Sequence, residues 1–401
     1  MAPCNGRVGY ARLARSRPSQ RAATKGADAR ERRTSCPVRS HESAVQARAG
    51  VNGPAALDGI VLDAAVPQPM TVQDLPAEDL PLSRLGEKRI LADIVLPLLN
   101  PGRSPDLAGD DCAFVSCRPG ERFAVSTDRV PWDLTGRSAG VMDLYDLGRH
   151  LAALNLSDIA AVGARPVGLL LNIALPPLMT VRDLLQIFSG ARAEASLHAT
   201  PIIGGDLSSS EHPELSATAL GLVGSGKEIR RRGAVAGDLL FVSRPELLGA
   251  AAFAYFRANF RQLSISSGDE ERLRSALKHP HPDFAAANAI RQSGVRATAM
   301  DNTDGLAQSL WELAAASEVT ARIDCDRLLL HPTVRRVAEA LQVPAISLAL
   351  GPGYDFGLVG TVSRAVDGLS IIGTVDEGPA NVLVENAGLP LLPPHGWDYW
   401  T

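Results

Sequence analysis

The chain has 401 residues, of which 45% are hydrophobic and 21% are charged, and its formal net charge is −4. A chain of this length and composition is typical of a soluble protein with enough apolar residues for two domain cores. It contains no apolar run of the roughly 18 residues that a membrane-spanning helix requires, so the sequence predicts no membrane partner.

Basic residues are concentrated at the start of the chain. Residues 1–50 contain eleven Lys and Arg and three Asp and Glu, a balance of +8, which leaves −12 for the remaining residues. An acidic body argues against nucleic acid as the main partner. Residues 1–85 show no sustained apolar periodicity, which is consistent with a disordered extension, an organelle transit peptide, or sequence upstream of a true start at Met70. We treat residues 1–85 as a disordered or non-native extension.

Cysteine usage indicates a reducing compartment. The five cysteines are odd in number, and their spacing does not match that of metal ligands. We therefore expect reduced thiols and a cytoplasmic location.

The predicted elements divide the rest of the chain into two domains, 86–232 and 233–401. In the first domain, helices are expected over 88–99, 141–162 and 180–197, and strands over 112–116, 122–128, 167–175, 200–204 and 215–223. In the second, strands are expected over 239–243, 297–301, 320–324, 346–350 and 356–363, and helices over 246–262, 283–293 and 305–317. This alternation predicts a mixed α/β (α+β) fold of two domains.

Aspartates follow several of the apolar runs. Three such runs end at Asp128, Asp206 and Asp301, and a fourth acidic pair, Asp110-Asp111, precedes another apolar run. Strands that end in carboxylates carry their charges to one edge of a sheet, where α/β proteins build their sites. Converging carboxylates repel one another unless divalent cations neutralise them. The pattern therefore predicts a Mg²⁺ site that holds a polyphosphate.

The usual nucleotide-binding motifs are missing from the sequence. It contains no GxxxxGK[ST] loop, no GxGxxG after a strand and no HExxH. If a polyphosphate binds, Mg²⁺ held by carboxylates must therefore supply the positive charge that a P-loop lysine supplies elsewhere.

Seven segments, in the same order along the chain, resemble the thiamine-monophosphate kinase family of the aminoimidazole-ribonucleotide-synthetase-like superfamily. The resemblance covers residues 86–401 and implies that superfamily's two-domain fold. The segments are Gly109-Asp-Asp-Cys-Ala113, Ser126-Thr-Asp128, Asn155-Leu-Ser-Asp-Ile-Ala-Ala-Val-Gly-Ala-Arg-Pro166, Ala174-Leu-Pro-Pro177, Gly204-Gly-Asp206, Arg231-Arg-Gly-Ala-Val-Ala-Gly-Asp238 and Asp301-Asn-Thr-Asp-Gly305.

The resemblance implies an enzyme that transfers the γ-phosphoryl group of ATP to thiamine monophosphate with the help of several Mg²⁺ ions, and relatives form homodimers. The central carboxylates of this chemistry would be Asp111, Asp128 and Asp206. The ATP contacts would come from Gly205, Asp206, Arg231 and Thr303. The implied metal ligands are Asp111, Ser126, Thr127, Asp128, Asp158, Asp206, Asp301 and Asp304.

The chain departs from the family pattern on the side of the phosphate acceptor. Tyr354 stands where the family has a glutamate, and Thr135 falls about where the family has a histidine. With Trp400 in the aromatic C-terminal stretch, these residues are the expected substrate contacts. Trp132 is expected to be a packing residue, because most tryptophans are.

Two further hypotheses follow from these departures. The chain could be a divergent member that uses ATP to phosphorylate a different small-molecule acceptor, or it could be an ATP-binding protein without turnover.

Overall fold

The computed structural model describes residues 79–85, 90–99, 117–258 and 260–385, all of which lie within one compact unit, Leu62–Thr401. Residues 1–78 of the extension expected over 1–85 lie outside the described residues, as do Asp111, the strand expected over 112–116, and Trp400. The boundary between 232 and 233 stays a prediction. No helix in the described ranges is both long and apolar enough to cross a bilayer.

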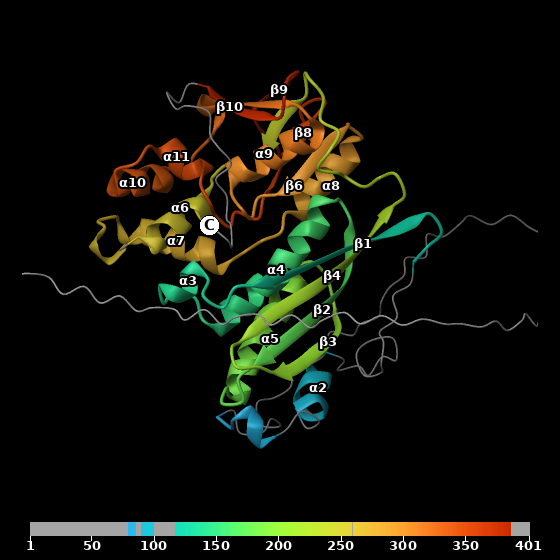
Figure 1. Ribbon diagram of the computed structural model, residues 1–401, viewed down its shortest axis with the longest axis vertical. Helices are drawn as coiled ribbons and strands as arrows, with labels where there is room; N and C mark the ends of the chain where they lie inside the picture. The colour runs from blue at the N-terminus through green and yellow to red at the C-terminus, as the bar shows by residue number, and fades with distance from the viewer. Residues whose placement is uncertain (1–78, 86–89, 100–116, 259, 386–401) are drawn as a thin grey trace, which may run out of the picture. The chain divides into compact units, whose positions relative to one another are not determined.

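The first half of the described chain forms a four-stranded mixed sheet in the order β1-β4-β2-β3 (Figure 1). Strand β4 runs antiparallel to both β1 and β2, whereas β2 and β3 are parallel. The strands are β1 (Glu121–Val130), β2 (Arg165–Leu175), β3 (Ile202–Ser209) and β4 (Glu214–Gly224), and the helices are α2 (Leu96–Leu99), α3 (Thr135–Ser138), α4 (Leu144–Ala161) and α5 (Val181–Leu197). A short 3-10 turn, η2 (Leu82–Arg84), and a π-helical turn, η3 (Leu91–Val95), precede them.

Helices α4 and α5 cover one face of this sheet (Figure 1). Both begin with capping boxes, in which Asp143 and Thr180 accept hydrogen bonds from the backbone N–H groups of Asp146 and Asp183. Along residues 214–220 of β4 the side chains that face these helices, such as Ala217 and Ala219, are buried, and the alternate side chains are not. The sheet therefore has a packed face and an open face.

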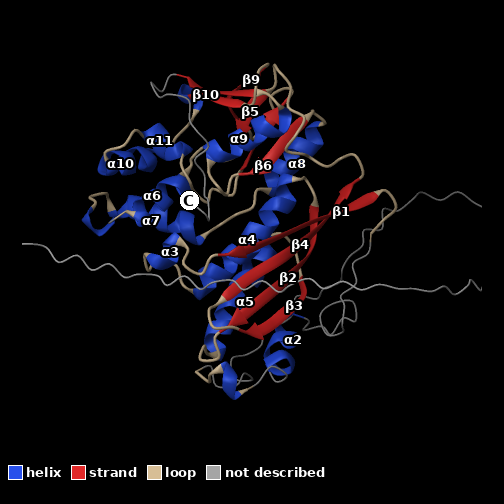
Figure 2. Cartoon of the chain, viewed as in Figure 1, coloured by secondary structure: helices blue, strands red, loops and turns tan. Residues whose placement is uncertain are grey.

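The second half of the described chain forms a second sheet (Figure 2). It has six strands in the order β10-β7-β9-β5-β8-β6. Its strands are β5 (Leu239–Val242), β6 (Ala297–Asp301), β7 (Thr320–Asp324), β8 (Leu358–Val362), β9 (Ser370–Asp376) and β10 (Asn381–Glu385). The helices are α6 (Leu248–Arg257), α7 (Ser267–Lys278), α8 (Phe284–Ser293), α9 (Leu306–Ser317), α10 (Pro332–Leu341) and α11 (Ala345–Leu350), with the 3-10 turns η4 (Phe260–Gln262) and η5 (Cys325–Arg327).

The mixed α/β fold is confirmed, and one predicted strand is wrong. Residues 346–350 lie in helix α11, which starts after Pro344 and buries Leu348, Ala349 and Leu350. A short, wholly apolar run has no periodicity that separates a buried strand from a buried helix. Strand β3 also continues past Asp206, because it pairs with β2 as far as Ser209. Asp206 therefore lies inside a strand instead of at its end.

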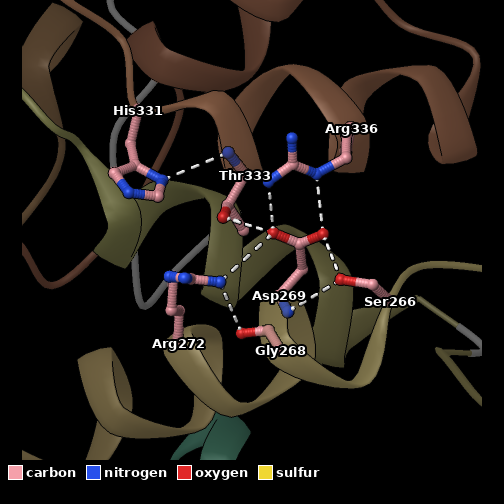
Figure 3. A network of polar contacts seen from close by, with 7 residues as sticks. All are labelled: Ser266, Gly268, Asp269, Arg272, His331, Thr333 and Arg336. Carbon is pink, nitrogen blue, oxygen red and sulfur yellow. Dashed lines mark hydrogen bonds and ion pairs between the residues drawn. The ribbon is translucent and has the colours of Figure 1, made fainter.

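A buried carboxylate joins α7 to α10 (Figure 3). Asp269 is 1% exposed, and its two oxygens accept hydrogen bonds from Nε and Nη2 of Arg336, both at 2.6 Å. The hydroxyl of Thr333 donates to one oxygen and that of Ser266 to the other, both at 2.6 Å. Charge-assisted bonds of this kind fix the two helix starts against each other.

Candidate active site

Four carboxylates from three elements come together where the two halves of the chain meet. Asp128 lies on β1 and Asp158 on α4, while Asp301 ends β6 and Asp304 lies in the turn before α9. Helix α4 packs against both β1 and β6, which brings the elements together. The hydroxyl of Ser126 donates to Oδ2 of Asp158 at 2.5 Å, and that of Thr303 donates to Oδ2 of Asp301 at 3.1 Å.

An asparagine on α4 fixes Asp128 in place. Asn155 is fully buried, and its Oδ1 accepts a hydrogen bond from the backbone N–H of Asp128 at 2.8 Å. Its Nδ2 donates to the backbone carbonyls of Asp128 at 3.3 Å and Leu151 at 2.9 Å. The side chain thus ties the edge strand β1 to the helix that carries Asp158.

The carboxylates raise one another's pKa. Burial raises the pKa of Asp158 and of Asp128, and each of the two is also raised by nearby aspartates. Burial and Asp158 raise the pKa of Asp301 to about 6, and burial, Asp301 and Glu312 raise that of Asp304 to about 6. The site therefore holds more negative charge than its surroundings compensate, which favours a bound cation.

Arg231 supplies positive charge beside the cluster. Its guanidinium partly offsets the rise that burial and the neighbouring carboxylates cause in the pKa of Asp158, Asp301 and Asp304. It also forms an ion pair with Glu312 on α9, whose second oxygen accepts a hydrogen bond from Gln308 at 3.1 Å. The side chain of Arg231 is half exposed, so an incoming anion can reach it.

Two of the expected metal ligands, Thr127 and Asp206, do not join this cluster. The hydroxyl of Thr127 donates to the carbonyl of Ala217 at 2.8 Å and accepts from Thr218 at 3.1 Å, and strand alternation places it on the open face. Asp206 is in register with Asn172, also on the open face. Because β1 and β3 are opposite edges of the sheet, Asp206 is about 14 Å across the strands from Asp128.

Gly205 is required by the packing of β2 against β3. Its φ is +150°, and a Cβ there would lie 1.7 Å from the carbonyl oxygen of Leu171. A side chain cannot be accommodated at this distance, so the glycine has a structural reason independent of any phosphate.

The donor set fits a hard divalent cation, because it consists of carboxylate and hydroxyl oxygens. Within the described ranges, no three acidic, histidine or cysteine side chains are already close enough to hold a metal ion. Asp111, an expected ligand, lies outside those ranges.

A cavity of about 510 Å³ is lined in part by Arg129, the residue that follows Asp128 in the sequence. Its wall includes both described residues of the expected acceptor contacts, Thr135 from the start of α3 and Tyr354 from the segment before β8. The remaining lining residues are Val130, Pro131, Trp132, Asp133, Leu134, Asn172, Pro213, Glu214, Leu215 and Ser216.

Sequence reasoning missed several of these features. Asn155 lies in one of the segments that resemble the family, but its residue type alone predicts no role, and a lone helical glutamate such as Glu312 is usually solvated. Trp132 could have been suspected from its position, four residues after Asp128.

Comparisons with known proteins identify the fold. Residues 109–223 match the family model of the AIR synthase related protein, N-terminal domain. The crystal structure of thiamine-monophosphate kinase from Stenotrophomonas maltophilia has a TM-score of 0.62 with this chain at 28% identity, covering 72% of this chain and 94% of that one. A structure described as AaThiL complexed with AMPPCP and TMP has the same fold, with a TM-score of 0.62 at 24% identity over 81% of this chain and all of that one. The chain thus has the fold of the AIR-synthase-related proteins.

Curated relatives narrow the class to one family. The thiamine-monophosphate kinase of Methanospirillum hungatei is 32% identical over 295 residues, which cover 71% of this chain and 92% of that protein. That of Mycobacterium tuberculosis is 31% identical over 324 residues, covering 79% and 93%. The chain belongs to the thiamine-monophosphate kinase family.

Proposed function

We propose that this protein is an ATP-dependent kinase that transfers the γ-phosphoryl group of ATP to the phosphate of thiamine monophosphate, giving thiamine diphosphate. The observation that carries the proposal is the meeting of Asp128, Asp158, Asp301 and Asp304 beside Arg231, in a chain of this family. The structural neighbour complexed with AMPPCP, an ATP analogue, and with TMP supports both substrates.

Mg²⁺ is the ion that we expect among these carboxylates. Bound Mg²⁺ would neutralise the carboxylates and supply positive charge for the phosphates. Asp128, Asp158, Asp301 and Asp304 would hold it, Ser126 and Thr303 would orient two of these groups, and Arg231 would meet the nucleotide's phosphates. Transfer of this type depends on positioning and charge neutralisation, and a substrate phosphate oxygen is already ionised, so no nucleophilic side chain is needed.

We also propose that two copies of the chain form a homodimer. Asp206 lies on the opposite edge strand from Asp128, so within one chain it is too distant to share an ion with the cluster. Phe123 and Val125, on the open face of the same sheet, are 48% and 62% exposed. A second copy that covered this face would bury them and could bring its Asp206 to the cluster.

The proposed cytoplasmic location rests on the cysteine pattern of the sequence, and Cys117 and Cys325 are free thiols.

The test is to incubate the purified protein with ATP, Mg²⁺ and thiamine monophosphate and to measure thiamine diphosphate and ADP by chromatography. We expect both products in equal amounts, and none of either without Mg²⁺. A panel of other phosphate and carboxylate acceptors tests the second candidate, which the exchange of the family's glutamate for Tyr354 and of its histidine for Thr135 favours. ATP binding without transfer to any acceptor would contradict both.

A further inference from the structure

We propose that Trp132 and Glu214 make the acceptor cavity selective for a positively charged heteroaromatic ring. This inference rests on the proposed function, because it concerns the part of the acceptor that does not react. Trp132 packs against the hydrophobic core, as expected, and the role inferred here is additional.

The position of Trp132 is fixed from the side away from the cavity. The guanidinium carbon of Arg137 lies 4.1 Å from the centroid of its ring. Trp132 lines the cavity and Arg137 does not, so this contact holds the half-buried ring from outside the cavity lining. Burial lowers the pKa of Arg137, and the nearby carboxylates of Asp183 and Asp143 partly offset this by attracting its positive charge.

A second aromatic ring borders the same cavity from the other half of the chain. Tyr354 is half-buried and has edge-on contacts with His150 and Phe253, at centroid distances of 6.1 and 6.2 Å. Two aromatic side chains held in place around a cavity of this size fit a flat ring between them or beside them.

The charged side chains that line the cavity determine whether it favours a cationic or a neutral ring. Asp133 and Glu214 both line the cavity, and neither side chain forms an ion pair with a residue in the described ranges. Arg129 also lines the cavity, where its positive charge is available to an anionic group of an acceptor. Two carboxylates and an aromatic lining attract a cationic ring, such as a thiazolium, more strongly than a neutral ring of the same shape.

The experiment compares the binding of two ligands by calorimetry, in the absence of ATP. One is thiamine monophosphate, and the other is its 3-deaza analogue, in which a neutral thiophene ring replaces the cationic thiazolium. The wild-type protein should bind the cationic ligand roughly tenfold more tightly. Trp132→Leu and Glu214→Gln should each reduce this ratio to about threefold or less, and Trp132→Phe should retain part of it.

Glu211→Gln is the matched control, because Glu211 is exposed, lies three residues from Glu214 and does not line the cavity. It should leave the ratio unchanged. Equal affinity of the wild-type protein for both ligands, or an undiminished ratio in Trp132→Leu and Glu214→Gln, would overturn the inference and leave the kinase proposal intact. Binding of neither ligand would overturn the acceptor itself, and the inference with it.

Discussion

At the scale of single residues, the cluster carries charges that oppose folding. Asp301 is 9% exposed and lies near three other carboxylates. Groups arranged in this way are typical of functional sites, where stability is sacrificed for binding.

Asp301→Asn should therefore stabilise the metal-free protein while it abolishes phosphoryl transfer. Removing one negative charge relieves the repulsion, and we expect a gain of about 1–2 kcal/mol in the free energy of unfolding at pH 7. Urea unfolding in the presence of a chelator measures this, with exposed Asp367→Asn as the control. A less stable variant that keeps full activity would show that Asp301 is an ordinary structural residue.

Glu194 on α5 is, in contrast to Asp301, a carboxylate whose negative charge stabilises the folded protein. It is fully buried, and burial raises its pKa, but His198, His281 and Arg149 outweigh this and hold the pKa at about 2. Nη2 of Arg149 lies 2.7 Å from Oε2, and Nδ1 of His281 lies 3.6 Å from Oε1.

Because this folded-state pKa lies below the unfolded value, Glu194 stabilises the protein above about pH 4.5, and the contribution is lost as the pH falls towards 2. We expect Glu194→Gln to cost about 2–3 kcal/mol at pH 6 and much less at pH 3. Denaturant unfolding of both proteins across this range measures the difference. A cost that stays constant with pH would contradict the ionised state assigned to Glu194.

At the scale of elements, the link between α7 and α10 depends on Asp269. Asp269→Ala leaves the hydroxyl of Thr333 and the guanidinium of Arg336 without their carboxylate. Arg336 is half exposed and can turn to solvent, so we expect a loss of about 2–3 kcal/mol, below the full cost of breaking a buried pair.

The urea midpoint measures this loss, and Glu271→Ala is the control, because Glu271 is exposed on the same helix. Equal effects of the two substitutions would show that the network contributes nothing specific.

Local sequence signals located most elements but did not show how they assemble. The boundaries of α4, α5 and β6 followed from caps, periodicity and glycines, whereas the run 346–350 had no periodicity to separate helix from strand. The expected convergence of Asp128 and Asp301 assumed a single sheet edge. They instead reach the cluster from two different sheets, which no local pattern encodes.

At the scale of the whole molecule, the position of Asp206 predicts complementation between two inactive variants. Asp128→Asn and Asp206→Asn should each abolish activity alone. If Asp206 acts in the site of the partner copy, a mixed dimer contains one site with both residues intact, and an equal mixture should recover about a quarter of wild-type activity.

The mixture is assayed after exchange of subunits in dilute denaturant, with each variant treated alone as the control. No recovery in a mixture shown to contain mixed dimers would place Asp206 outside the partner's site.

The most direct test of the carboxylate cluster is the Mg²⁺ dependence of nucleotide binding. Calorimetric titration with AMPPCP should give an affinity at least about tenfold higher with Mg²⁺ than with a chelator, and Asp301→Asn should remove most of this difference. An affinity that is the same with and without Mg²⁺, or a difference that survives in Asp301→Asn, would contradict a metal-bridged nucleotide site at Asp128, Asp158, Asp301 and Asp304.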